Sequence, residues 1–270
     1  MKIALTGATG NLGKGVLRNL VLRHAPGDVI ACVRNPDAAP ETWREWGVTC
    51  RKCDYDDPMS MATAFRDVSK LLLISSPHPD DDVRYRHHVA AIEAAKEAGV
   101  ECLVYTSIAR AERGRLPLHR LHLDTEQALR ESGLSYVILR NAYYMDIVKF
   151  LGVREAATSG ELWSPPGDWA FNTVARDDLA LATATVLTEE GHEGRTYELV
   201  ASKLWTLRDL AAALTAATGR QVRYRTNADM KSPLFDMLAM ADMKFTSTDL
   251  ERLTGGALRT VADEVRDLFR

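Results

Sequence analysis

A group of three glycines near the N-terminus constrains this chain more than any other feature. The segment Thr6-Gly-Ala-Thr-Gly-Asn-Leu-Gly13 directly follows the apolar run Lys2–Thr6 and overlaps the start of an amphipathic stretch, Leu12–Arg23. A chain that leaves a strand, turns sharply and packs a helix closely on that strand needs positions without a Cβ. The free N–H groups at such a helix start favour a pyrophosphate. The pattern predicts a dinucleotide site at Gly7, Thr9, Gly10, Asn11, Leu12 and Gly13, against the alternative of an empty loop of the same shape.

The first 150 residues alternate between short runs of valine, isoleucine and leucine and amphipathic stretches. This alternation is typical of a parallel sheet covered by helices on both faces. We expect strands at Lys2–Thr6, Val29–Val33, Thr49–Arg51, Lys70–Ser75, Cys102–Thr106 and Tyr136–Leu139. We expect helices at Leu12–Arg23, Ser60–Phe65, Val83–Ala98, Leu118–Glu131 and Ala142–Val148. The predicted fold class is α/β, with a doubly wound Rossmann sheet over residues 1–152.

The pattern becomes less regular after Gly152, where residues 153–270 predict a smaller α/β substrate lobe interleaved with the sheet. Glycines and prolines make Gly160–Trp169 look like a loop. Further along, the sequence predicts a short segment at Phe171–Val174, a helix from Arg176, a strand at Thr196–Val200 and a helix at Leu207–Thr218. The aromatic side chains of Trp163, Trp169 and Phe171 favour a place in the core of the lobe over a platform for a substrate ring.

Charge and hydropathy exclude several classes of protein. The 34 basic and 37 acidic residues give a net charge of −3 and are scattered, so we expect neither nucleic acid nor an anionic membrane surface as a partner. No run reaches the roughly 18 apolar residues that a membrane span requires. The N-terminus Met1-Lys-Ile-Ala-Leu5 meets the glycines too soon for a signal peptide, which predicts a cytoplasmic protein. A homodimer is left open.

The four cysteines, Cys32, Cys50, Cys53 and Cys102, lie in or beside predicted strands. The spacing of Cys50 and Cys53 could suit a redox pair or half of a zinc site. A redox pair opens a helix, however, and no second pair of cysteines or histidines completes four zinc ligands. We expect core thiols, with Cys50 and Cys53 on opposite faces of a strand, and no metal.

The end of the second predicted strand bears on the choice of nucleotide. In this fold an acidic residue there binds a free ribose 2′-hydroxyl, whereas an arginine pairs with a 2′-phosphate. The chain reads Cys32-Val-Arg-Asn-Pro36, so that Arg34 lies 21 residues after Gly13 and no acid takes its place. We expect NADP(H) rather than NAD(H), although an exposed arginine without a role remains the alternative.

Several segments of the chain together form a recognisable set. They are the glycine segment, Val33-Arg-Asn-Pro36, Asp54-Tyr55, Leu71-Leu-Leu-Ile-Ser-Ser76, Ala94-Ala-Lys-Glu-Ala-Gly-Val100, Tyr105-Thr-Ser107, Leu139-Arg-Asn141 and Gly191-His-Glu-Gly194 followed by Tyr197-Glu-Leu199. This set resembles the NmrA-like atypical short-chain dehydrogenases, and within them the bacterial NAD(P)H:quinone oxidoreductase type. The resemblance covers residues 1 to about 225 and resumes near Thr246. It implies an NADPH-binding Rossmann domain, a small C-terminal lobe and a site in the cleft between them.

The resemblance also implies roles for particular residues. Asp54 and Tyr55 would meet the adenine, and Ser75 and Ser76 the cofactor ribose. Asn141, Tyr143 and Tyr144 would lie near the nicotinamide, and Thr106 and Ser107 belong to the matching stretch of the cofactor site. The chain departs from the type in being shorter between about Thr226 and Phe245, a region that helps to cover the substrate, and in lacking an asparagine at the end of Tyr143-Tyr-Met-Asp-Ile147.

Ordinary short-chain dehydrogenases protonate their product with a Tyr-x-x-x-Lys pair, which is missing from the helix predicted after Ser107. His122 and Glu126 have that spacing, and Glu126 could orient the ring and raise its proton affinity, although a surface pair would look the same. His122 and Tyr144 are therefore the candidate catalytic residues. Two functions remain: an NADPH-dependent reductase acting on a quinone or related carbonyl compound, and a non-catalytic NADP(H) sensor that binds a protein partner.

Overall fold

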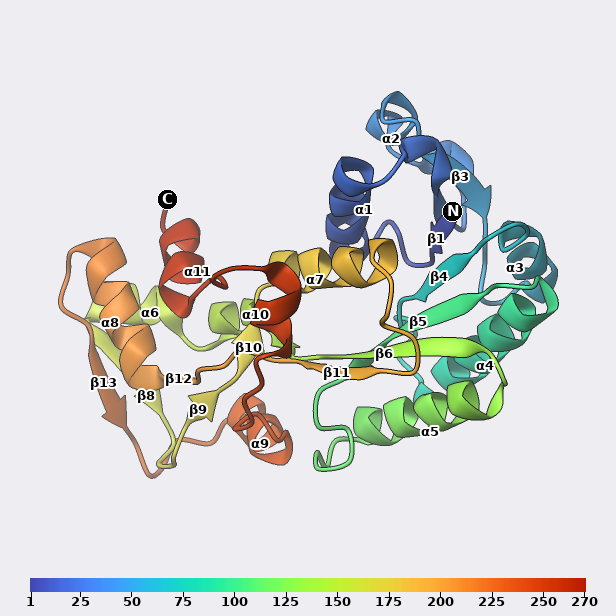
Figure 1. Ribbon diagram of the computed structural model, residues 1–270. Helices are drawn as coiled ribbons and strands as arrows, with labels where there is room; N and C mark the ends of the chain where they lie inside the picture. Colours follow the sequence, from blue (N-terminus) through green and yellow to red (C-terminus); the bar gives the residue numbers. More distant parts are fainter.

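A seven-stranded parallel sheet forms the centre of the protein (Figure 1), whose 270 residues are all described by a computed structural model. Its strands lie in the order β3-β2-β1-β4-β5-β6-β11. Their bounds are β1 Ile3–Leu5, β2 Val29–Val33, β3 Thr49–Lys52, β4 Lys70–Leu73, β5 Cys102–Ile108, β6 Ser135–Asn141 and β11 Thr196–Leu199. The order reverses between β1 and β4, where a doubly wound sheet opens a crevice for ligands at the carboxyl ends of its strands. The predicted fold class is confirmed.

Helices cover both faces of this sheet, because strands such as β2 and β4 are apolar on both sides and would otherwise expose them. In Figure 1, α1 and α7 lie over one face, and α3, α4 and α5 lie over the other. The helices of this part are α1 Asn11–Arg23, α2 Glu41–Glu45, α3 Pro58–Ala64, α4 Asp81–Glu97, α5 Pro117–Glu131, α7 Arg176–Thr188 and α10 Asp249–Thr254, with short 3₁₀ turns η1 Pro26–Asp28 and η2 Pro36–Ala38. Each face has its own buried apolar cluster.

A third apolar cluster forms the core of the smaller lobe, on the left in Figure 1. Its helices are α6 Val153–Ser159, α8 Leu207–Thr218, α9 Pro233–Met240 and α11 Val261–Leu268. Three two-stranded pairs complete it: β7 Tyr143–Tyr144 with β10 Thr173–Val174, β9 Ala170–Phe171 with β12 Trp205–Thr206, and β8 Glu161–Ser164 with β13 Arg223–Thr226. None of the helices in the protein combines the length and the apolar character needed to cross a membrane.

Two predicted elements are wrong, and in both places distant pairing decides the outcome. Ala142–Val148 is not an α-helix: Tyr143 and Tyr144 pair with Thr173 and Val174, and a 3₁₀ helix η3, Met145–Phe150, follows. The predicted loop Gly160–Trp169 contains β8, which pairs with β13 about 60 residues later. Neither partner can be read from the local sequence.

Candidate cofactor and active site

The glycine segment forms a tight turn between β1 and α1. Gly7 has a φ of 61°, and the N–H of Gly10 donates to the Gly7 carbonyl oxygen at 3.0 Å. A Cβ on Gly13 would lie 2.2 Å from that same oxygen, so no other residue fits there without moving the backbone. No side chain caps the N-terminus of α1, and its first turn has no acidic residue. The N–H groups at this helix end are therefore available to an anion.

A cavity of about 440 Å³ opens beside this turn, at the carboxyl ends of the strands. Eight of the predicted cofactor residues line it, from four separate loops: Gly7, Thr9, Gly10, Arg34, Asp54, Tyr55, Ser75 and Ser76. Seven others do not: Asn11, Leu12, Gly13, Thr106, Ser107, Asn141 and Tyr143. Of these, Leu12 and Gly13 are buried in the packing of α1, whereas Asn11 stands exposed at its first turn.

Arg34 stands exposed at the rim of this cavity, just after β2, and forms no ion pair. Its positive charge is therefore available to an anionic group. Cys32 and Cys53 lie deeper in the same wall. Cys53 packs in one apolar cluster and Cys50 against the opposite one, as expected for side chains that alternate across a strand. The contact with Cys53, together with burial, raises the pKa of the Cys32 thiol.

Tyr55 connects the glycine turn to the neighbouring strands. Its hydroxyl oxygen lies 2.8 Å from both Thr6 Oγ1 and the Ile74 carbonyl oxygen, and Thr6 Oγ1 also accepts from the Ile74 N–H at 3.0 Å. Burial raises the pKa of Tyr55, which therefore stays protonated. The ring stacks on His87 with centroids 5.4 Å apart. Tyr55 thus shapes the cavity wall and fixes the turn at the same time.

Two adjacent histidines of α4 hold the loop after β4, and the sequence analysis assigned them no such role. His87 Nδ1 lies 2.9 Å from Ser76 Oγ, and its Nε2 lies 2.9 Å from Asp56 Oδ1. The N–H of Ser76 donates to His88 Nε2 at 2.9 Å. Because that nitrogen accepts, we assign the His88 proton to Nδ1, 2.9 Å from Thr125 Oγ1. The one signal in the sequence is that both histidines lie on the helix that follows Ser75 and Ser76.

The predicted pairing of His122 with Glu126 is wrong. Glu126 is completely buried and accepts hydrogen bonds from Ser107 at 2.6 Å and from Arg140 at 2.9 Å. Burial alone would raise the pKa of Glu126, but the bonds from Arg140 and Ser107 outweigh it and hold that pKa below its ordinary value. The hydroxyl of Ser107 is therefore engaged within the fold.

His122 instead faces Tyr105, whose hydroxyl oxygen lies 2.7 Å from His122 Nδ1. Burial lowers the pKa of His122 to about 3, so the ring is neutral at pH 7. We assign its proton to Nε2, because Tyr105 can then donate to Nδ1. The side chain is 5% exposed and does not line the cavity beside the glycine turn. His122 can thus offer a neutral N–H donor, but not an imidazolium.

The end of β6 brings three further predicted residues to the junction of sheet and lobe. Asn141 is buried, and its Oδ1 atom has no hydrogen-bond partner. The Tyr143 hydroxyl lies 3.1 Å from His119 Nε2, while His119 Nδ1 lies 3.1 Å from the Leu116 carbonyl oxygen and so carries the ring proton. Tyr143 therefore donates to His119. Burial lowers the pKa of His119 and raises that of Tyr143, which keeps both groups neutral.

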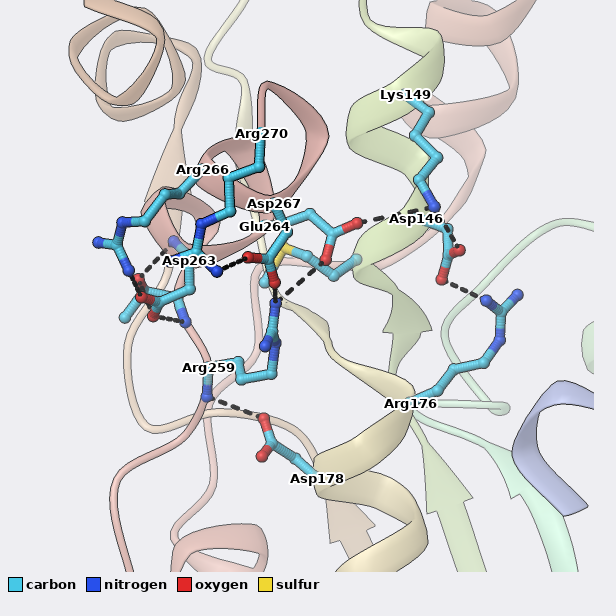
Figure 2. A network of polar contacts seen from close by, with 12 residues as sticks. Asp146, Lys149, Arg176, Asp178, Arg259, Asp263, Glu264, Arg266, Asp267 and Arg270 are labelled. Atoms are coloured by element: carbon cyan, nitrogen blue, oxygen red, sulfur yellow. Dashed lines mark hydrogen bonds and ion pairs between the residues drawn. The ribbon is translucent and has the colours of Figure 1, made fainter. Parts of the chain in front are cut away.

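Tyr144 has different surroundings from Tyr143. The guanidinium of Arg176 lies over its ring, 4.2 Å from the centroid, and pairs with Asp146. Figure 2 shows Arg176 and Lys149 on either side of Asp146, at one end of a charged network that extends to α11. Burial raises the pKa of Tyr144. This packing makes Tyr144 a link between α7 and the lobe.

The aromatic residues expected in the lobe core have different positions. Phe171 is buried and Trp169 packs against the same cluster, but Trp163 is 43% exposed, so its expected core place is wrong. Trp163 lies on β8, where alternation turns it away from buried Leu162 and Ser164.

Comparisons with known proteins agree with this geometry. The model of the NmrA-like family matches residues 1–249. Quinone oxidoreductase 2 of Escherichia coli K12 is 37% identical over 99% of this chain and 98% of that protein. The crystal structure of Citrobacter sp. triphenylmethane reductase complexed with NADP(H) is 38% identical, covers 99% of both chains and has a TM-score of 0.89. That of the E. coli NADPH-dependent quinone oxidoreductase complexed with NADPH is 35% identical, covers 99% of this chain and all of that one, and has a TM-score of 0.87. The chain therefore belongs to the NmrA-like family.

Proposed function

We propose that this protein is an NADPH-dependent reductase that transfers a hydride to a quinone or a related carbonyl compound. The observation that carries the proposal is the cavity beside the glycine turn, with the uncapped start of α1 at one side and Arg34 at its rim. Relatives that cover nearly the whole chain, a quinone oxidoreductase and a triphenylmethane reductase, support the same chemistry.

The residues fit NADP(H). The turn left free by Gly7, Gly10 and Gly13 would hold the pyrophosphate against the N–H groups of α1, and Arg34 would pair with the 2′-phosphate. At the other end of the site, the unpartnered Oδ1 of Asn141 suits an amide N–H such as that of nicotinamide. Thr106 Oγ1 accepts from the Ser75 N–H at 3.0 Å and so shapes the loop between the two ends.

When bound, NADPH supplies the hydride: NADPH, a proton and a quinone give NADP⁺ and a hydroquinone. The oxygens of a hydroquinone are much less basic than an alkoxide, so the reaction needs little help from an acid. We propose that the enzyme works without the Tyr-x-x-x-Lys pair. The neutral Nε2–H of His122 would stabilise charge on a substrate oxygen by a hydrogen bond, with no full proton transfer. Water would supply the proton.

The roles of Tyr143 and Tyr144 follow from their contacts. The Tyr143 hydroxyl, held by His119, and the Tyr144 ring, held by Arg176, would form the aromatic wall on the lobe side of the nicotinamide. Tyr144 would thus position the substrate rather than donate a proton. A non-catalytic NADP(H) sensor is the second function that the sequence left open, and the two reductases among the relatives make it the weaker one.

The test is quinone-dependent loss of NADPH absorbance with purified protein. We expect turnover with a simple naphthoquinone, and its loss in Gly13→Ala, whose new Cβ would lie 2.2 Å from the Gly7 carbonyl oxygen. Gly27→Ala is the matched control, because a Cβ there meets nothing within 4 Å. Tight NADPH binding without turnover of any quinone or carbonyl compound would contradict the reductase function and favour the non-catalytic sensor.

A further inference from the structure

A second cavity, of about 420 Å³, lies between the loop before α5, strand β9 and the segment after α9. In Figure 1, α9 lies between the lobe and the loop that leads into α5. The N–H of Arg115 donates to the Met240 carbonyl oxygen at 2.9 Å, which fastens that loop to the end of α9. None of the residues predicted from the sequence to bind the cofactor lines this cavity.

The floor of the cavity is apolar and partly aromatic. Phe171, Leu238 and Met243 are buried beneath it, and the half-buried ring of Trp169 forms one side. The Trp169 ring stacks on Phe171, with ring centroids 6.4 Å apart and planes within 11° of each other. A cavity of this volume, with the half-buried Trp169 ring on one side and buried apolar side chains beneath it, suits a ligand with one or two aromatic rings.

The rim of the cavity carries uncompensated positive charge. Its two carboxylates are already paired, Asp168 with Lys244 at 2.7 Å and Asp242 with Arg110 at 3.5 Å. Arg113 and Arg115 are exposed and form no ion pair. The Arg115 guanidinium donates to the Ala239 carbonyl oxygen at 3.3 Å, but neither arginine has a carboxylate partner. In a chain with a net charge of −3, two arginines without a carboxylate partner at the edge of this cavity favour an anionic substituent on the ligand.

Two links connect the cavity to the groups that the proposed function places beside the substrate, although neither Tyr143 nor His119 lines it. Phe171 on its floor lies two residues before Thr173, which pairs with Tyr143. Asp242 on its rim is close enough to His119 for its charge to act on the ring that holds the Tyr143 hydroxyl. A ligand in this cavity would therefore lie on the lobe side, next to the segment that pairs with Tyr143.

We infer that this cavity binds an aromatic anion and that the substrates of the enzyme are quinones or related aromatic compounds that bear a sulfonate or carboxylate group. Arg113 and Arg115 bind the anionic group, and the half-buried ring of Trp169, supported from behind by Phe171, packs against the rings. The assignment of the ligand as substrate depends on the proposed function, whereas the binding site itself does not.

Calorimetric titration without NADPH tests the site directly, with 1,4-naphthoquinone-2-sulfonate as the probe and 2-methyl-1,4-naphthoquinone as its neutral counterpart. The double variant Arg113→Gln/Arg115→Gln keeps polar donors but removes both charges. We expect it to weaken binding of the sulfonate at least tenfold and that of the neutral quinone less than twofold. Salt should weaken binding of the sulfonate alone, because these charges are exposed to solvent.

Arg220→Gln is the matched control, since Arg220 is an exposed arginine of the lobe that forms no ion pair. It should bind both probes as the unchanged protein does. Equal affinity for the two probes, or a double variant that binds the sulfonate normally, would overturn the inference. The same substitutions are then followed in KM for each quinone. If the double variant selectively loses sulfonate binding but the unchanged protein oxidises no NADPH with either quinone, the binding site is supported and the reductase function is contradicted. If the unchanged protein reduces both quinones with equal KM values and the double variant leaves these values unchanged, the reductase function is supported and the binding site is contradicted.

Discussion

At the scale of single residues, the cofactor preference depends on Arg34. A charge-assisted hydrogen bond to the 2′-phosphate should favour NADPH over NADH by about 10- to 150-fold. Titration of Arg34→Ala with both cofactors should show this preference lost, with NADH affinity almost unchanged. Arg18→Ala is the control, because Arg18 is exposed on α1 and lies outside the cavity. Equal affinities of the unchanged protein for the two cofactors would contradict the assignment.

His122 provides a second prediction at this scale. Because its ring is neutral and its pKa is about 3, His122→Ala should lower kcat less than tenfold, against the 10²- to 10⁴-fold typical for loss of a general acid. NADPH affinity should not change. A decrease in kcat of more than a hundredfold, with a kcat of the unchanged protein that titrates between pH 6 and 8, would instead show that His122 acts as a general acid.

The same histidine makes stability depend on pH. The unfolded chain binds a proton at His122 near pH 6.5, whereas the folded protein binds it only near pH 3. Between these values the unfolded state holds more protons. The contribution of His122 to the free energy of unfolding is therefore fully present above pH 6.5 and falls as the pH decreases, by up to about 1.4 kcal/mol per pH unit. Urea unfolding of His122→Asn should show a shallower decline over this window. Parallel curves for the two proteins would contradict the buried neutral ring.

At the scale of elements, Arg140 joins three parts of the fold. Its guanidinium, on β6, contacts the buried Glu126 of α5 and Glu198 of β11, each at 2.9 Å. Arg140→Ala would leave Glu126 buried with only Arg130 as a charged partner, and we expect a loss of about 3–5 kcal/mol in the free energy of unfolding. Arg130→Ala is the control: Arg130 also pairs with Glu126, but its side chain is 36% exposed, so less than about 1 kcal/mol should be lost. Equal losses in the two variants would show that burial does not decide the effect.

At the scale of the whole molecule, the central sheet is completed by α7 and β11, which follow the first elements of the smaller lobe in the sequence. The expected boundary at residue 152 stays a prediction, but α7 and β11 lie beyond it and return to the sheet. α7 packs so closely on α1 that a Cβ on Gly15 would lie 2.9 Å from that of Ala180. The charged network of Figure 2 adds contacts between α7, η3 and α11.

We therefore expect that a fragment of residues 1–152 does not fold by itself, although it contains the complete glycine turn. Removal of α7 and β11 would expose the apolar face of α1 and leave β6 as an unprotected edge. Urea titration followed by circular dichroism should show no cooperative transition for the fragment. The full chain should show one transition, and NADPH should raise the urea concentration at its midpoint. Cooperative unfolding of the fragment together with NADPH binding would establish an independent domain.

The sequence by itself determined the parts of this protein that depend on local geometry. The alternation of apolar strands and amphipathic helices gave the sheet and most of its helix bounds, because burial on two faces leaves a direct pattern. The glycine turn could be predicted because each of its glycines is required by local steric constraints. The position of Arg34 at the end of β2 could be predicted from the strand pattern in the same way. Tertiary structure decided the rest. Only the packing of α5 against β5 and β6 shows that Glu126 belongs to Arg140 and that His122 faces Tyr105. Likewise, the cavity beside Trp169 exists because β9 and α9 meet the loop before α5 from far apart in the chain, and no local pattern records such a meeting.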